Sequence, residues 1–270
     1  MVMKMKTKIV SLFAGILFFT ACEKVIEIPL EDADRKFVIE GVLRDSPGEN
    51  YILISKTGSV YESSNFEKIS GASVSVTDQS GTTYVFTEVV GAPGRYTNAT
   101  FAISPNNNYD LSVISGTESF ASSSQSFYKP ELDSLSYLEQ VGTFGVGTDT
   151  TYLVFFSFTD QVDQENYYRL IVYVNGVPDG TYYITNDELF DGQPYSQPAF
   201  ATTVEKGDTV IMELLGMDKS AYTYFFSLSN ATAEGPFAPT PANPVSNIEG
   251  GAIGYFNAYT TDTMSIIIPQ

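Results

Sequence analysis

Short segments in which apolar and polar residues alternate recur along most of this chain. In GASVSVTDQSGTTYVFTEV, Val74 and Val76 alternate with serines before the turn-like residues 78–81. After them, Tyr84 and Phe86 resume the alternation. A period of two is typical of strands with one buried face, and Asp, Ser and Gly are typical of turns. The segment therefore predicts a β-hairpin, and the recurrence of its pattern predicts a mostly-β fold.

The strand-like segments fall into two blocks. In the first, residues 37–121, six or seven short strands predict an immunoglobulin-like β-sandwich. In the second, residues 134–270, the strongest strands are YLVFFSF and YYRLIVYV. A serine cluster followed by YKPELD, at 122–133, separates the blocks. We therefore expect two β-sandwich-like domains, an N-terminal one and a C-terminal β-rich one.

One segment departs from the strand pattern. In DKSAYTYFFSLSNA, Asp218 is a favourable helix N-cap residue. Tyr222, Phe225 and Phe226 then recur at helical spacing. The pattern predicts one short helix near residues 218–231, in a chain that is otherwise strands and turns.

The first residues have the pattern of an export signal. Three lysines precede IVSLFAGILFF, an apolar run too short to span a bilayer, and small residues then lead to Cys22, the only cysteine. This arrangement resembles the lipobox of bacterial lipoproteins, in which the cysteine is lipidated and the signal is removed before it. We expect a signal peptide over 1–21, lipid on Cys22 and a polar tether over 22–36. The alternative is a free or buried thiol, although exported chains usually carry paired cysteines.

The charge balance and the missing residue types exclude several functions. Acidic residues number 32 against 14 Lys and Arg, whereas nucleic-acid binding needs basic patches. The chain has no histidine, which excludes Ser–His–Asp catalysis and zinc held by histidines. A carboxylate pair that hydrolyses glycosides stays open as a remote alternative. We expect no enzymatic activity, no cofactor and no nucleic-acid partner.

Two acidic segments raise the possibility of metal binding. Their acidic residues are Asp160, Asp163, Glu165, Asp187, Glu188 and Asp191. Oxygen-rich loops can bind calcium, but NDELFDG lacks the D-x-D-x-D-G spacing, and one loop rarely supplies six ligands. We therefore favour solvated acidic turns without a metal, and calcium stays an open alternative.

Three glycines in NIEGGAIGYF, namely Gly250, Gly251 and Gly254, resemble part of a nucleotide-binding fingerprint. That fingerprint requires a helix after the glycines, whereas the pattern here predicts a strand. We expect a turn or bulge that packs Tyr255 and Phe256 into the core. The alternative is an edge at which a partner docks.

Several segments, in their order along the chain, resemble envelope proteins of Bacteroidota. The stretch from GASVSV to GRY is similar to the carboxypeptidase-regulatory or transthyretin-like sandwich. With LDSLSY, ENYYRL, NDELFDG, KGDTV and NIEGGAIGYFNAY, the chain resembles the Bacteroidota lipoprotein family designated domain of unknown function four-two-four-nine. Members of that family typically accompany TonB-dependent outer-membrane transporters and have no established activity. The resemblance implies such a transporter as partner and transfers no catalytic residue.

These features predict a non-enzymatic, lipid-anchored accessory protein of the outer membrane, partnered with a TonB-dependent transporter in nutrient capture or uptake. The alternative is a structural or assembly lipoprotein of the envelope without a small ligand. The family resemblance favours the cell surface over the periplasmic face. A proline-rich loop suits binding, because prolines lower the ordering cost of docking. The residues expected to contact the partner are Pro239, Pro241, Pro244, Asn247, Gly250 and Gly251.

Overall fold

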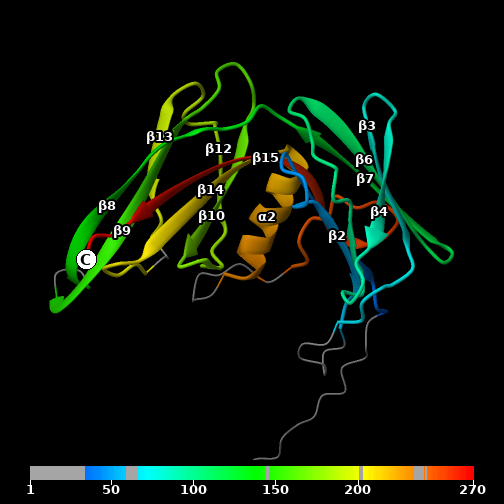
Figure 1. Ribbon diagram of the computed structural model, residues 1–270, viewed down its shortest axis with the longest axis horizontal. Helices are drawn as coiled ribbons and strands as arrows, with labels where there is room; N and C mark the ends of the chain where they lie inside the picture. Colours follow the sequence, from blue (N-terminus) through cyan, green and yellow to red (C-terminus); the bar gives the residue numbers. More distant parts are fainter. Residues whose placement is uncertain (1–33, 59–65, 144–145, 201–202, 234–239, 241) are drawn as a thin grey trace, which may run out of the picture. The chain divides into compact units, whose positions relative to one another are not determined.

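The computed structural model describes residues 34–58, 66–143, 146–200, 203–233, 240 and 242–270 (Figure 1). The predicted signal peptide, Cys22, Pro239 and Pro241 lie outside the described residues. The predicted mostly-β, sandwich-like fold is confirmed, as is one short helix among the described elements. In these described ranges, no helix combines the length and the apolar character needed to cross a membrane.

Seven strands in the first half of the chain form one continuous part of a large sheet. They are antiparallel, in the order β1-β2-β5-β4-β3-β6-β7. Val74 and Val76 point into the core and alternate with less buried residues, as the sequence pattern predicts. The strands are β1 (Phe37–Arg44), β2 (Tyr51–Lys56), β3 (Ser73–Asp78), β4 (Thr83–Glu88), β5 (Arg95–Thr97), β6 (Asn107–Ser115) and β7 (Glu118–Ser126).

The second half of the chain contains two sheets that face each other. Strands β13-β9-β8 form a three-stranded sheet, which packs against the part of the large sheet made by β12, β10 and β14. Phe158, Val172 and Met212 are among the buried residues between them. The strands are β8 (Leu132–Thr143), β9 (Val146–Thr159), β10 (Tyr167–Val174), β11 (Val177–Pro178), β12 (Tyr183–Asn186), β13 (Pro194–Pro198) and β14 (Thr209–Met217).

Helix α2 (Lys219–Ala231) covers the opposite face of the large sheet, against β10 and β15 (Figure 1). The predicted N-cap is confirmed, because the Asp218 carboxylate accepts a hydrogen bond from the Ala221 amide at 2.8 Å. Phe225 then packs on Tyr255, with ring centroids 4.8 Å apart. A third cluster of buried aromatic and aliphatic residues therefore fixes the helix on the sheet.

The last strand, β15 (Ile253–Ile267), changes partner along its length. Its first part runs parallel to β1, with Phe256 opposite Gly41. Its second part runs antiparallel to β14, with Thr260 opposite Gly216. The chain's final strand thus joins the first-half strands to the second-half strands in one sheet.

The core inside β1–β7 is completed by residues from far along the sequence. These residues are Ile248, Ala252, Phe256 and Ala258. Nearby, the Glu249 amide donates to the Ala121 carbonyl at 2.7 Å, which ties this segment to β7. The predicted first block, 37–121, therefore does not contain its whole core, and the division into two domains stays a prediction.

The serine cluster that was expected to separate the two blocks is strand instead. Strand β7 continues to residue 126, so the first residues of the segment 122–133 are strand. Ser122 donates to the Asn247 carbonyl at 2.7 Å, and Ser124 donates to the Asp218 carboxylate. Both serines are buried. Serine is frequent in loops, so sequence alone favours a linker, but here its hydroxyl satisfies polar groups inside the fold.

Candidate functional site

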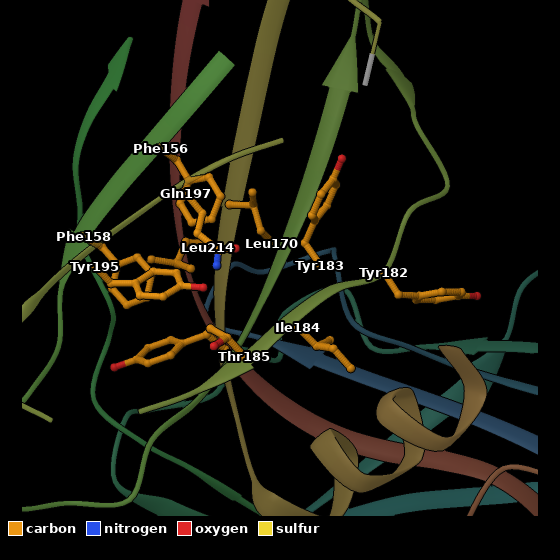
Figure 2. Close-up of a pocket in the computed structure, with 11 residues that line it drawn as sticks. Phe156, Phe158, Leu170, Tyr182, Tyr183, Ile184, Thr185, Tyr195, Gln197 and Leu214 are labelled. Atoms are coloured by element: carbon orange, nitrogen blue, oxygen red, sulfur yellow. The ribbon is translucent and has the colours of Figure 1, made fainter. Parts of the chain in front are cut away.

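A cavity of about 170 Å³ lies between the two facing sheets of the second half (Figure 2), and we call it the aromatic cavity. Strands β9 and β13 form one wall, and β10, β12 and β14 form the other. None of the described residues that line it carries a charge. The lining residues are Phe156, Phe158, Tyr168, Leu170, Tyr182, Tyr183, Ile184, Thr185, Tyr195, Gln197 and Leu214.

One wall comes from β9 and its neighbour β13. Phe158 lies opposite Tyr195, and Phe156 lies opposite Gln197. Opposite residues in an antiparallel pair share a face, so the four side chains point to the same side of their sheet. The ring centroids of Phe158 and Tyr195 are 5.4 Å apart. This wall is therefore a surface of aromatic rings with one exposed amide, that of Gln197.

In the second wall of the cavity, opposite residues of β10 and β12 likewise share one face of their sheet. Tyr168 lies opposite Thr185 on β12, and Leu170 lies opposite Tyr183. The ring centroids of Tyr168 and Phe158 are 4.6 Å apart, so the two walls meet at this end. Because β12 and β13 both lie at sheet margins, the cavity sits at the open side of the sandwich.

The phenols of Tyr168 and Tyr195 are neutral at physiological pH. Burial raises the pKa of Tyr168, and its hydrogen bonds to Asp160 and Tyr128 raise it further. Burial also raises the pKa of Tyr195. The cavity thus offers aromatic faces, hydroxyls and one amide to a ligand. A charged ligand would lose its hydration without gaining an opposite charge, so the lining favours an uncharged one.

Three carboxylates, those of Asp160, Asp187 and Asp191, meet beside the cavity, and we call them the acidic cluster. One oxygen atom from each carboxylate lies within 4.8 Å of one oxygen atom of the other two. Asp160 and Asp187 are only 5% and 6% exposed, whereas Asp191 is exposed. Burial raises the pKa of Asp187, and the negative charge of Asp160 adds to this effect. The Tyr168 hydroxyl donates to Asp160 and so connects the cluster to the cavity.

The prediction of solvated acidic turns is wrong for Asp160 and Asp187. Asp163, Glu165 and Glu188 are exposed, as expected. Both buried carboxylates accept hydrogen bonds from the chain. Asp187 accepts from the Asn166 amide, where the chain continues the ladder between β10 and β12. Asp160 accepts from the Tyr168 hydroxyl and the Gly192 amide. Sequence reasoning treated the two acidic segments separately and missed that strand pairing brings them together.

The cavity residues also escaped the sequence analysis, although their strands were predicted. The available signal was the aromatic residues at every second position, such as Phe156 and Phe158 in β9. Alternation shows that such residues share a face, but not which strand faces them across the sandwich. The cavity depends on that second, non-local relationship.

The residues predicted to contact a partner lie in different environments. Asn247 uses its amide inside the chain, since its Oδ1 accepts from the Phe256 amide at 2.9 Å and its Nδ2 donates to the Phe256 carbonyl at 2.8 Å. Gly250 and Gly251 are exposed, with φ of +89° and +88°. Pro244 is half-buried. Their role in partner binding stays a prediction.

The geometry at these glycines agrees with the expected turn. A Cβ on Gly250 would lie 2.3 Å from the Ser119 carbonyl oxygen, so the backbone approaches β7 too closely for a side chain. Strand β15 follows these two glycines, as predicted, whereas a nucleotide-binding loop would be followed by a helix. Tyr255 and Phe256 are both buried.

Comparison with known proteins identifies the family of this chain. No curated protein matches this chain. A family model described as "Domain of unknown function (DUF4249)" matches residues 23–265, which is most of the sequence. The chain therefore belongs to the DUF4249 family.

Proposed function

We propose that this protein is a non-enzymatic, lipid-anchored accessory protein of the outer membrane that binds a small, uncharged nutrient for a TonB-dependent transporter. The aromatic cavity is the observation that carries the binding part of this proposal. A volume of about 170 Å³ suits a ligand portion the size of one ring. Aromatic walls bind such a ring through their faces, and Gln197 and the tyrosine hydroxyls orient its polar groups.

The chemistry of the lining supports binding rather than turnover. Catalysis of hydrolysis requires a nucleophile, or an acid and base of suitable pKa, next to the substrate. The cavity is lined by phenols, a threonine, an amide and apolar side chains. Of the cluster carboxylates, Asp160 accepts a hydrogen bond from the hydroxyl of the lining residue Tyr168.

The proposals of a lipid anchor and of a transporter partner are supported by the sequence. The lipobox-like segment ending at Cys22 supports lipid attachment, in a Bacteroidota lipoprotein with a transthyretin-like N-terminal sandwich. The family resemblance supports a TonB-dependent transporter as partner and the cell surface as location. A firm anchor needs two or more acyl chains, which lipoprotein processing supplies. The body then binds nutrient while it stays next to the transporter.

Ligand binding can be tested with a variant that blocks the cavity. Gln197→Trp places a bulky ring at the mouth, and it should abolish the thermal stabilisation caused by any neutral nutrient that raises the melting temperature of the unmodified protein. Ser196→Trp is the matched control, because Ser196 is exposed and neighbouring strand residues point to opposite faces. Equal stabilisation of both variants would show that the cavity is not the binding site.

The partnership can be tested separately by affinity purification from detergent-solubilised outer membrane. A TonB-dependent transporter should co-purify with the protein. Deletion of residues 238–245 should release the transporter while the melting temperature of the isolated protein stays unchanged. If no β-barrel protein co-purifies with the intact chain, the transporter role is wrong and a structural or assembly role in the envelope takes its place.

A further inference from the structure

The acidic cluster lacks a positive partner inside the protein. Within the described part of the chain, Asp160, Asp187 and Asp191 form no ion pair with lysine or arginine. The nearby Lys219 pairs instead with Glu165, and both side chains are exposed. Two buried carboxylates and a third beside them therefore repel one another without a compensating charge.

A buried amide oxygen beside the cluster also lacks a partner. Asn166 is 2% exposed, and its Oδ1 accepts no hydrogen bond. The orientation of this amide is fixed, because Nδ2 donates to the Gln161 and Gln164 carbonyls at 3.0 and 2.8 Å. A buried oxygen acceptor without a donor is costly unless a ligand satisfies it.

Strand pairing directs this amide to the side where the carboxylates meet. The Asp187 amide donates to the Asn166 carbonyl, and the Asn166 amide donates to the Asp187 carboxylate at 2.8 Å. The two residues thus continue the ladder of β10 and β12 and share one face. Asn166 lies two residues before Tyr168, so it also shares the face from which the Tyr168 hydroxyl reaches Asp160.

Solvent can reach this place. A surface depression of about 410 Å³ adjoins the cluster. Its lining contains five carboxylates and one amide, from Asp163, Gln164, Glu165, Asp187, Glu188 and Asp191. The depression concentrates negative charge and would raise the local concentration of cations.

We propose that Asp160, Asp187, Asp191 and the Asn166 Oδ1 form a binding site for a divalent cation of the calcium class. All four donors are oxygen atoms, which suit a hard cation, whereas zinc and copper favour nitrogen and sulfur. Calcium takes six to eight oxygens in flexible geometry, so water from the depression completes its shell. The cation neutralises the cluster and joins the segment before β10 to the segment after β12.

Terbium luminescence and calorimetry test this site on the full chain. The chain has no tryptophan, so a terbium ion at the site would be excited by tyrosine, chiefly Tyr168. Calcium should bind with one strong site, compete with terbium and raise the melting temperature relative to a chelator. Magnesium should bind at least about tenfold more weakly. Tyr168→Phe should reduce terbium emission but leave the calorimetric affinity for terbium within about threefold.

The variants separate a built site from diffuse attraction. Asp191→Asn alters the exposed member of the cluster and keeps an oxygen that can accept from the Asp163 amide, and it should weaken calcium affinity at least about tenfold. Glu188→Gln removes the same charge from an exposed position outside the cluster and should change affinity less than about threefold. The absence of calcium binding to the full chain, equal losses in the two variants, or equal affinity for magnesium would each overturn the proposal.

Discussion

Gly41 on β1 lies so close to Phe256 on β15 that a Cβ on Gly41 would be 2.6 Å from the Phe256 Cδ2. The two residues are opposite each other in the parallel pair. Gly41 does not have a positive φ, so its backbone would accept another residue. The glycine is required for space, since the Phe256 ring fills the core above it.

Gly41→Ala should lower the free energy of unfolding by about 1–3 kcal/mol, because the added methyl overpacks this contact. Urea denaturation measures the loss. Combining the change with Phe256→Leu should cost less than the sum of the two single changes, because the smaller side chain makes room. Strict additivity would show that the two residues do not compete for the same space.

Arg44 on β1 and Glu213 on β14 form an ion pair across β15, near the point where β15 changes partner. Their side chains are 14% and 13% exposed. Arg44→Met should cost about 3 kcal/mol, because it leaves Glu213 buried without its cation. Arg44→Met with Glu213→Leu should recover at least about half of that loss, as judged by denaturant midpoints. A double variant no better than the single one would contradict the explanation.

Glu40 gives a pH-dependent stability. Burial raises its pKa above the ordinary 4.5, and the charge of Lys68 opposes this only in part. The folded chain therefore binds the Glu40 proton more tightly than the unfolded chain does. The stabilisation that this difference gives is complete below the pKa of Glu40 in the unfolded chain, and it is lost as pH rises through the pKa of Glu40 in the folded chain. Glu40→Gln should raise the melting temperature by roughly 1–3 °C at about pH 7 and by nothing at about pH 4.

Glu118→Gln controls for the loss of one negative charge, since Glu118 is exposed in β7. Its melting temperature should follow the unmodified protein at both pH values. An equal gain at neutral pH in both variants would mean that general charge repulsion, not the burial of Glu40, limits stability.

The Asn247 side chain forms two hydrogen bonds with the backbone of Phe256. Its Oδ1 accepts from the Phe256 amide at 2.9 Å, and its Nδ2 donates to the Phe256 carbonyl at 2.8 Å. Asn247→Ala should cost about 2–3 kcal/mol, because both backbone groups lose their partner. Asn243→Ala, at an exposed position of the same loop, should cost less than about 0.5 kcal/mol. Similar costs for the two variants would show that water replaces the amide.

Cys22→Ser should prevent lipidation and leave the precursor unprocessed by the lipoprotein peptidase. The body should still fold, because the chain has no second cysteine with which Cys22 could form an intramolecular disulfide. Metabolic labelling with a clickable fatty acid measures the attachment. Label retained by the serine variant would refute the assignment.

Local features of the fold were predictable from sequence because each depends on a few neighbouring residues. Asp218 caps α2 as expected, and the turn at 78–81 places Gly81 at a φ of +86°. The alternation in β3 and β4 gave the correct buried face. In each case, propensity and periodicity act within a short segment.

Features that depend on distant segments were not predictable. In the sequence, Ser124 has the character of a loop residue. In the structure, its hydroxyl donates to the carboxylate of Asp218, which lies far along the chain. The sequence does not indicate that Asp160 lies close to Asp187, because the two meet only after strand pairing has brought their segments together. The cavity and the acidic cluster both arise from pairings whose register a single sequence does not specify.

Because β15 pairs with β1 and then with β14, the first seven strands can complete their core only after β15 has docked. Ile248 to Ala258, which complete the core of the first seven strands, are synthesised long after those strands. Until they arrive, β1 has an unpaired edge and the core beneath it is open. Folding therefore requires closure of a loop that spans most of the sequence between β1 and β15, and we expect this closure to slow folding. A C-terminal truncation would destabilise the beginning of the protein as much as its end.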